Sequence, residues 1–257
     1  VCGRGCVVHP GPATNSISSS GLRYAAGLMS NHTVAARVAA FADQLDGKPL
    51  PAAQMQLGAY PFPRSDYLVV RRPGWTATWK GRSNRTIPAR CVNGDSKMSA
   101  NTGEGATFVY RAAEAGVAHA SIWPVIDWQQ YPGITSEQGN LQPCAWDYQY
   151  TQSPTFVGPI GDGLIGGAAQ VLGQNGGLAA RRSWLFAEGG VASLVTGARG
   201  SSVDTVLTTL ANQRLGGAVS VLFLNGTTGS YHNGNWSLAA SAPNGVDAVW
   251  HNGTMYR

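Results

Sequence analysis

The stretch that decides the fold is DYLVVRRPGWTATWKG, residues 66–81. It contains two short runs of β-branched and aromatic residues, YLVVRR and TATWKG, which stand on either side of a Pro-Gly pair. Val, Thr, Tyr and Trp favour strands, whereas a Pro-Gly pair favours a turn. The stretch therefore predicts two strands with a turn between them.

Short runs of the same kind follow along the rest of the chain, separated by clusters of Gly, Pro, Asn and Ser. Strands at such spacing are typical of an antiparallel sandwich or barrel. We therefore expect a mainly β protein, with a large antiparallel β-sandwich over residues 66–257. The further strands are predicted at ATFVYR, ASIWPVIDW, SWLFAE, VASLVTG, AVSVLFLNG and DAVWHNG.

The residues before this sandwich predict a short helical segment and a linker. The run NHTVAARVAAFADQLDG indicates a helix over residues 31–46, which Asn31 or Thr33 can cap. Residues 48–65 carry four prolines and are predicted to form a linker. We therefore divide the chain into 1–47, 48–65 and 66–257. The apolar residues at helical spacing are Val34, Val38, Phe41 and Leu45.

The motifs that would indicate a nucleotide, metal or serine-nucleophile site are missing from the sequence. The glycine-rich run at 160–177 predicts a strand and a turn, because it lacks the Lys-Ser/Thr of a phosphate-binding loop. The five histidines show no paired spacing, and no G-x-S-x-G motif occurs. We therefore expect no cofactor and no metal.

The composition favours an acidic partner that is not nucleic acid. The 257 residues are 43% hydrophobic, which allows a substantial core, and the net charge is +5. A basic balance is compatible with an anionic polysaccharide. The Lys and Arg residues are not clustered into the basic stripe that nucleic-acid binding requires. No apolar run reaches the length of a membrane span.

Cysteines and glycosylation sequons favour a secreted, extracellular glycoprotein. Proximity along the chain favours the disulfides Cys2–Cys6 and Cys91–Cys144, although four cysteines allow three pairings. The first residues do not form a signal peptide, so we expect a longer precursor. The five sequons, which predict N-linked glycans, begin at Asn31, Asn84, Asn225, Asn235 and Asn252.

Two segments combine residues that suit sugar binding. Residues 71–111 bring together basic residues, tryptophans, amides and carboxylates, which suit a groove for an acidic sugar and suit charged hairpin tips as well. The run IWPVIDWQQYPGIT, residues 122–135, sets one carboxylate among aromatic side chains. Its tryptophans can stack on sugar rings or pack in a sandwich core. The residues alone leave both alternatives open in each segment.

The order of several blocks resembles the central β-domain of polysaccharide lyase family 8, which contains the hyaluronate, chondroitin AC and xanthan lyases. DYLVVRRPGW at 66–75 resembles the family strand D-x-V-V-x-R-R-P-x-(W/F). WPVIDWQQYPGIT at 123–135 resembles W-P-x-x-D-W-x-x-x-P-G-T-T. Further resemblances lie at Asn93-Gly-Asp-Ser, Gly103-Glu-Gly, FVGPIGDG (156–163), ARRSWLFAEG (180–189) and residues 208–214.

The resemblance implies a supersandwich-like fold and the chemistry of a lyase. Family members cleave uronate-containing chains by β-elimination, using an Asn, a His and a Tyr on an N-terminal α/α toroid. The chain resembles the end of that toroid followed by the sandwich, so we expect most of the toroid to be missing and the sandwich to be truncated after Arg257. The resemblance also makes Trp123 and Trp128 core and hairpin residues.

The site residues that the resemblance implies are few. Arg4 matches the first arginine of the family segment G-R-x-I-S-R, and Asn93 matches an asparagine near the family's active cleft; we expect both to be catalytic. Arg90 stands where some members carry a supporting Glu, and Asp95 replaces the Glu of N-G-E-N. We expect these two and Trp75 to bind substrate.

Two functions follow from these observations. The first is a secreted lyase that cleaves acidic polysaccharide, represented here by a fragment. The second is a glycosylated extracellular sandwich that binds carbohydrate or supports an assembly without catalysis. The second is favoured by Val8 and Ser96, which stand where the family carries an arginine and an asparagine. Whether the chain is part of an enzyme is left open by the sequence. A truncated sandwich also predicts open sheet edges that another chain covers.

Overall fold

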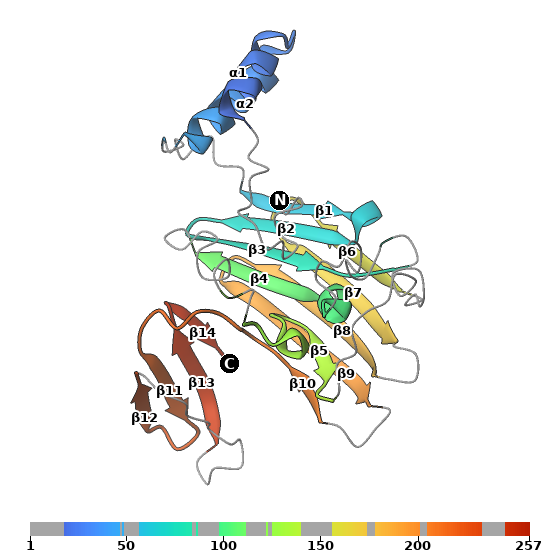
Figure 1. Cartoon of the computed structure of the whole chain (residues 1–257), viewed down its shortest axis with the longest axis vertical. Coiled ribbons are helices and arrows are strands. Elements are labelled where there is room, and N and C mark those ends of the chain that lie inside the picture. Colours follow the sequence, from blue (N-terminus) through green and yellow to red (C-terminus); the bar gives the residue numbers. More distant parts are fainter. Residues whose placement is uncertain are drawn as a thin grey trace.

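The computed structural model consists of helices at one end and antiparallel sheets over the rest (Figure 1). The elements occur in the order α1, α2, then β1 to β14 with three 3-10 helices among them, counting only the described residues. The structure describes residues 18–46, 48, 57–83, 86, 98–111, 122, 125–139, 156–173, 178–200, 205–232 and 245–257.

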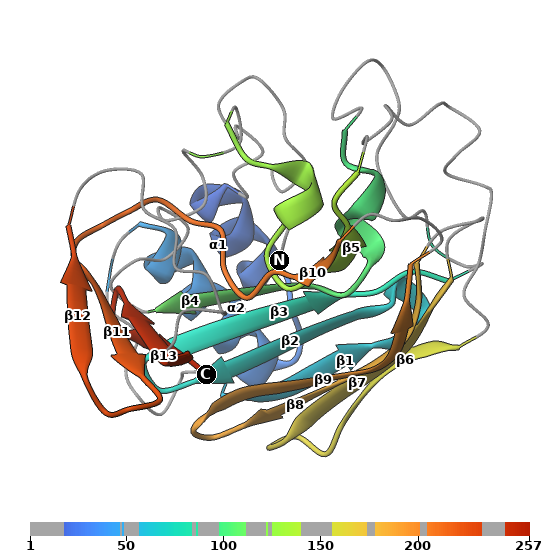
Figure 2. The same cartoon turned by 90° about the horizontal axis from the view of Figure 1, so that it is seen from below.

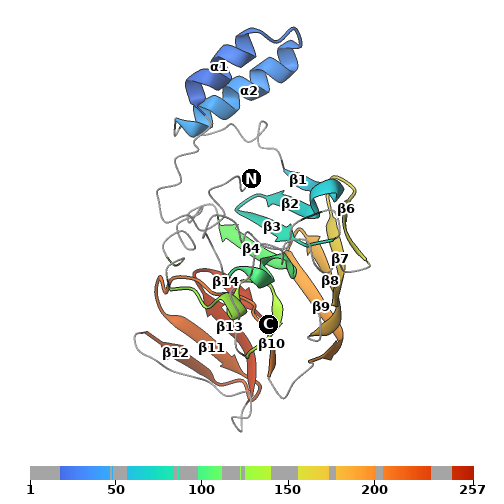
Figure 3. The same ribbon diagram turned by 45° about the vertical axis from the view of Figure 1, so that its right-hand side comes forward.

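Two helices form an antiparallel hairpin that stands away from the sheets (Figures 1 and 3). Helix α2, His32–Leu45, is the predicted helix, and Asn31 caps it by accepting a hydrogen bond from the amide of Val34 at 3.1 Å. Helix α1, Ser19–Gly27, was not predicted. It has only nine residues, and its start is marked by one capping residue, Ser18.

The first sheet comes from the stretch around Asp66. Strands β1 (Gly58–Phe62), β2 (Tyr67–Arg72), β3 (Trp75–Lys80) and β4 (Ala106–Arg111) lie in the order β1-β2-β3-β4, and every pair is antiparallel. Strand β1 lies inside the segment predicted to be a linker. Its proline is tolerated because β1 is an edge strand, where a missing backbone N–H need not break the ladder.

The second sheet contains the glycine-rich run. Its order is β6-β7-β8-β9, again antiparallel throughout. Strands β6 (Val157–Gly161) and β7 (Gly166–Gly173) form the predicted strand and turn. The turn is closed by Asp162, whose carboxylate accepts hydrogen bonds from two following backbone amides. Strands β8 (Ala179–Ala187) and β9 (Gly190–Arg199) complete the sheet.

Two smaller sheets follow. Strand β5 (Thr135–Glu137) pairs with β10, Val206–Thr208. The last sheet has the order β12-β11-β13-β14. Its strands are β11 (Val219–Phe223), β12 (Thr228–Tyr231), β13 (Val246–His251) and β14 (Thr254–Tyr256).

The first and second sheets pack face to face around the main core, as Figure 2 shows. Alternate residues of β2 and β3 point inward and meet alternate residues of β8. Trp79 and Trp184 meet edge to face, with ring centroids 5.3 Å apart. The prediction of a mainly β, antiparallel sandwich is confirmed. The buried members of this core are Ala59, Leu68, Val70, Ala77, Trp79, Ala168, Trp184 and Phe186.

The strand predicted at ASIWPVIDW is wrong for the part that the structure describes. Residues 125–127 form a turn and irregular backbone, and Trp128–Gln130 is a 3-10 helix. Asp127 caps this helix by accepting a hydrogen bond from the amide of Gln129 at 2.9 Å. A side chain that binds the local backbone competes with strand pairing, and Pro124 cannot donate to a ladder.

Candidate functional site

Most of the residues predicted to form the site lie outside the described residues. This is the case for Arg4, Arg90, Asn93 and Asp95. The sequon residues Asn84 and Asn235 and all four cysteines also lie outside the described residues. The predicted pairings Cys2–Cys6 and Cys91–Cys144 therefore stay predictions.

Trp75 is the predicted binding residue that the structure describes. It opens β3, directly after the turn at Pro73 and Gly74, and pairs with Arg72 and Arg111 on the flanking strands. Its side chain is half-buried and packs against the edge of the main core. Because part of the indole is exposed, Trp75 can contribute both to packing and to ligand contact.

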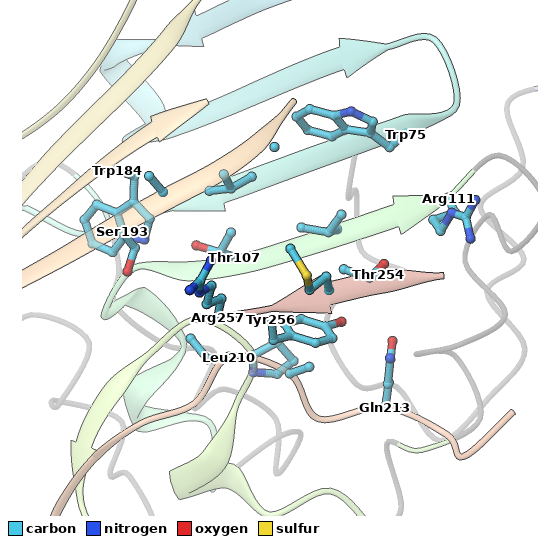
Figure 4. Close-up of a pocket in the computed structure, with 18 of the residues that line it drawn as sticks. Trp75, Thr107, Arg111, Trp184, Ser193, Leu210, Gln213, Thr254, Tyr256 and Arg257 are labelled. Carbon is cyan, nitrogen blue, oxygen red and sulfur yellow. The ribbon is translucent and has the colours of Figure 1, made fainter. Parts of the chain in front are cut away.

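Trp75 lines a cavity of about 720 Å³ between the first sheet, the second sheet and the last sheet (Figure 4). The wall is built from the start of β3, strand β4, the middle of β8, the start of β9, strand β14, and the segment that follows β10. A cavity of this size is within the range of small-molecule binding sites. Its polar lining includes Thr107, Ser193, Gln213 and Thr254.

Arg182 forms one wall of this cavity and is almost fully buried, with 3% of its surface exposed. It donates hydrogen bonds to the carbonyl of Gly133 and, at 3.3 Å, to the hydroxyl of Ser193. Its guanidinium lies 4.3 Å from the ring centroid of Trp184, a cation–π contact. Burial lowers the pKa of Arg182 to about 10, and the nearby Glu104 carboxylate opposes the shift, so the side chain is charged at neutral pH.

Arg111 joins the last sheet to the first across the opposite side of the cavity. Its guanidinium donates a hydrogen bond to the carbonyl of Asn252 at 3.1 Å, in the turn between β13 and β14. Gly253 in that turn has φ +70°, and a Cβ there would lie 1.5 Å from the Arg111 guanidinium. The backbone conformation of this turn therefore favours a glycine at position 253.

A buried ion pair lies behind the cavity wall. Glu104 and Arg82 are joined at 2.5 Å, and their side chains are 0% and 2% exposed. The following Gly105 has φ +83°, and a Cβ there would lie 2.3 Å from the indole of Trp184. Gln170 donates to the carbonyl of Gly103 at 3.0 Å. Glu104 is therefore an internal structural charge and does not face a substrate.

Asp66 anchors the segment that precedes Arg90 in the sequence. It is fully buried and its backbone lies in the left-handed region, with φ 47°. Its carboxylate accepts hydrogen bonds at 2.6 Å from the hydroxyls of Ser83 and Thr86. Lys80 lies next to this group, and burial lowers its pKa to about 8 while the charge of Asp66 opposes the shift.

A family comparison gives the site its context. Residues 57–257 match the family described as polysaccharide lyase family 8, super-sandwich domain. The chain belongs to polysaccharide lyase family 8. It is 27% identical to chondroitinase-AC of Pedobacter heparinus over 159 residues, which is 62% of this chain and 22% of that protein. It is 31% identical to hyaluronate lyase of Thermasporomyces composti over 186 residues, or 69% of this chain and 23% of that protein.

Solved structures agree with this family 8 fold. A chondroitinase AC lyase matches with a TM-score of 0.72 and 24% identity, covering 84% of this chain and 31% of that one. Paenibacillus xanthan lyase matches with a TM-score of 0.72 and 18% identity, covering 90% and 24%. The chain thus spans less than a third of the length of these relatives.

The W-P-x-x-D-W block of family 8 is structural in the part of this chain that the structure describes. Trp128 stacks on Tyr131 with ring centroids 5.7 Å apart, and Tyr131 meets Phe108 edge to face at 5.2 Å. Both Trp128 and Tyr131 pack on the face of the first sheet that points away from the main core. The carboxylate of Asp127 is used as a helix cap. Trp123 lies outside the described residues.

The sequence did not identify Arg82, Arg111 or Arg182 as site residues. Arg182 could have been found, because the alternation along β8 places it on the same inward face as Trp184 and Phe186. Arg111 and Arg82 gave no such signal, since one ends a strand and the other follows one.

Two further features are absent from the described residues. No group of three or more His, Cys, Asp or Glu side chains there is arranged to hold a metal ion. No described helix is long and apolar enough to cross a membrane.

Proposed function

We propose that this chain is the sandwich portion of a lyase that cleaves an acidic, uronate-containing polysaccharide. The observation that carries the proposal is the match of residues 57–257 to the family 8 sandwich, together with relatives named chondroitinase and hyaluronate lyase. The chemistry is β-elimination. A base removes the proton at C5 of the uronate, the C5–H electron pair forms the C4–C5 double bond, and the C4–O bond breaks as its oxygen takes a proton.

The proposed contributions of this chain are binding and positioning. Arg4 and Asn93 are proposed to act near the reacting sugar, with Asn93 neutralising the carboxylate so that the C5 proton becomes more acidic. Arg90, Asp95 and Trp75 are proposed to hold the polymer. What supports Trp75 is its partly exposed indole at a cavity wall.

An absorbance assay tests the proposal. The protein encoded by the complete gene is incubated with hyaluronan, chondroitin, xanthan and alginate, and the ultraviolet absorbance of an unsaturated uronate is followed. We expect a steady rise with at least one polymer and none after Asn93→Ala. If the folded protein gives no rise with any of the four, the lyase proposal is wrong and a non-catalytic carbohydrate-binding or structural role replaces it.

We propose further that the protein is extracellular and N-glycosylated. Of the described sequons, Asn225 is exposed in the turn between β11 and β12, and its side-chain oxygen accepts hydrogen bonds from the amide and hydroxyl of Thr227 at 3.0 and 2.7 Å. Asn31 is exposed beside the helix that it caps, and Asn252 is half-buried. Peptide mapping after enzymatic deglycosylation tests the sequons, and non-reducing mapping tests the disulfides Cys2–Cys6 and Cys91–Cys144.

Another chain is proposed to cover an open sheet edge. Strand β9 is ten residues long, and its first charged residue is Arg199 at its end. Within the described residues it pairs with β8 alone. A long edge strand whose only charge is at its end is a template for strand addition. Cross-linking followed by mass spectrometry should place a partner at β9, and a strictly monomeric protein without such cross-links would contradict this proposal.

A further inference from the structure

The cavity at Trp75 carries more positive charge than its described surroundings neutralise. Arg111, Arg182 and Arg257 line it, and no described lining residue is an Asp or a Glu. Arg257 is paired with Asp247 at 3.0 Å. The described hydrogen-bond partners of Arg111 and Arg182 are carbonyl and hydroxyl oxygens, which are neutral. Two guanidinium charges therefore border the cavity without a carboxylate bonded to them in the described part of the chain.

The buried charge of Arg182 is only partly offset from behind. The acidic group that raises its pKa is Glu104, and this carboxylate also forms an ion pair with Arg82. A buried charge is costly unless an opposite charge compensates it. An anion on the cavity side of Arg182 would supply that compensation.

The remaining lining suits a sugar ring. Figure 4 shows Trp75 and Tyr256 on different sides of the cavity, with Thr107 and Thr254 between them. Aromatic faces stack on pyranose rings, and hydroxyl groups bond to sugar hydroxyls. An inorganic anion would need the arginines but not the aromatic rings, and a neutral sugar would leave the arginines uncompensated.

We infer that this cavity binds an acidic sugar unit, with its carboxylate on the Ser193 side of Arg182 and its ring between Trp75 and Tyr256. The choice of a uronate rests on the proposed function, whereas the need for an anion rests on the charges alone. The site would hold a uronate of the polymer on the sandwich itself.

The test uses one pair of matched substitutions. Ser193→Asp places a carboxylate beside Arg182. This carboxylate accepts hydrogen bonds from the guanidinium and repels an incoming anion. Ser183→Asp adds the same charge on the outer face of β8, where Ser183 is exposed, and serves as the control. Both variants are checked by circular dichroism and thermal unfolding. Calorimetry then measures binding of a hyaluronan disaccharide, of its carboxyl-reduced neutral counterpart and of sodium sulfate.

The inference expects binding of the acidic disaccharide alone. Ser193→Asp should raise its Kd by at least about tenfold, because one charge-assisted contact is lost, and Ser183→Asp should change it by less than about twofold. The inference is overturned if the neutral disaccharide binds as tightly as the acidic one. It is also overturned if sulfate binds but the acidic disaccharide does not, or if the folded chain binds none of the three. Lyase activity of the complete protein is measured separately, so activity without disaccharide binding here removes only this site.

Discussion

The buried pair Arg82–Glu104 gives the sharpest prediction about stability. In Glu104→Gln the side chain keeps its shape but loses its charge, which removes the carboxylate that forms the ion pair with the buried Arg82. Both side chains are at most 2% exposed and lie 2.5 Å apart, so water cannot replace the lost carboxylate. Removing one member of such a pair costs about 3–5 kcal/mol, which is a large share of the stability of an ordinary domain.

Chemical denaturation measures this cost. We expect Glu104→Gln to lower the free energy of unfolding by about 3–5 kcal/mol, and the double variant Arg82→Met with Glu104→Met to recover most of the loss. The control is Asp247→Asn, which removes the surface ion pair between Asp247 and Arg257. Because Arg257 is 69% exposed, losing this pair should lower the free energy of unfolding by about 1 kcal/mol or less. A Glu104→Gln variant that is as stable as the control would refute the structural role of Glu104.

Three further predictions concern the same region. Gly105→Ala should lower the free energy of unfolding by about 2–5 kcal/mol, because positive-φ strain is added to a clash with Trp184. Gly74→Ala, with φ +86° and open space around it, should lower it by only about 1–2 kcal/mol. Equal losses for the two variants in urea titrations would contradict the clash. Lys80 has a folded-state pKa near 8, below its usual 10.5, so between pH 8 and 10.5 the unfolded chain binds more protons and the free energy of unfolding should rise with pH. Lys80→Met should lose this rise. Parallel curves of unfolding free energy against pH for the two proteins would contradict the prediction. Tyr110 has the opposite sign, because burial raises its pKa to about 12. Between pH 10 and 12 the unfolded chain binds fewer protons at this residue, so its contribution to stability should fall as the pH rises. Tyr110→Phe should remove this contribution to the fall, which unfolding followed by circular dichroism measures.

The strands could be predicted from the sequence where side-chain periodicity and turns agree. YLVVRR and TATWKG became β2 and the larger part of β3 because runs of β-branched and aromatic residues stand on both sides of a Pro-Gly turn. The strand predicted at ASIWPVIDW, residues 120–128, is wrong in its described part because a proline and a capping aspartate compete with strand pairing, although its described apolar residues still pack in a core. Strand β1 was missed because prolines argue against a strand unless its place at an edge is known.

The cavity and its charges could not be predicted from the sequence. Arg82, Glu104 and Arg182 are far apart along the chain, and only the packing of two sheets brings them together. The sequence pointed to Trp75 as a binding residue, but its neighbours Ser193 and Tyr256 come from strands whose pairing no local pattern specifies.

The most direct test of the central claim is the fate of water during cleavage. The complete protein is incubated with a uronate polymer in water labelled with oxygen-18, and mass spectrometry measures the masses of the products. Elimination predicts fragments that carry an unsaturated uronate and no heavy oxygen. Products without an unsaturated uronate, with one labelled oxygen gained for each bond cleaved, as hydrolysis requires, would contradict the assignment of this sandwich to a lyase.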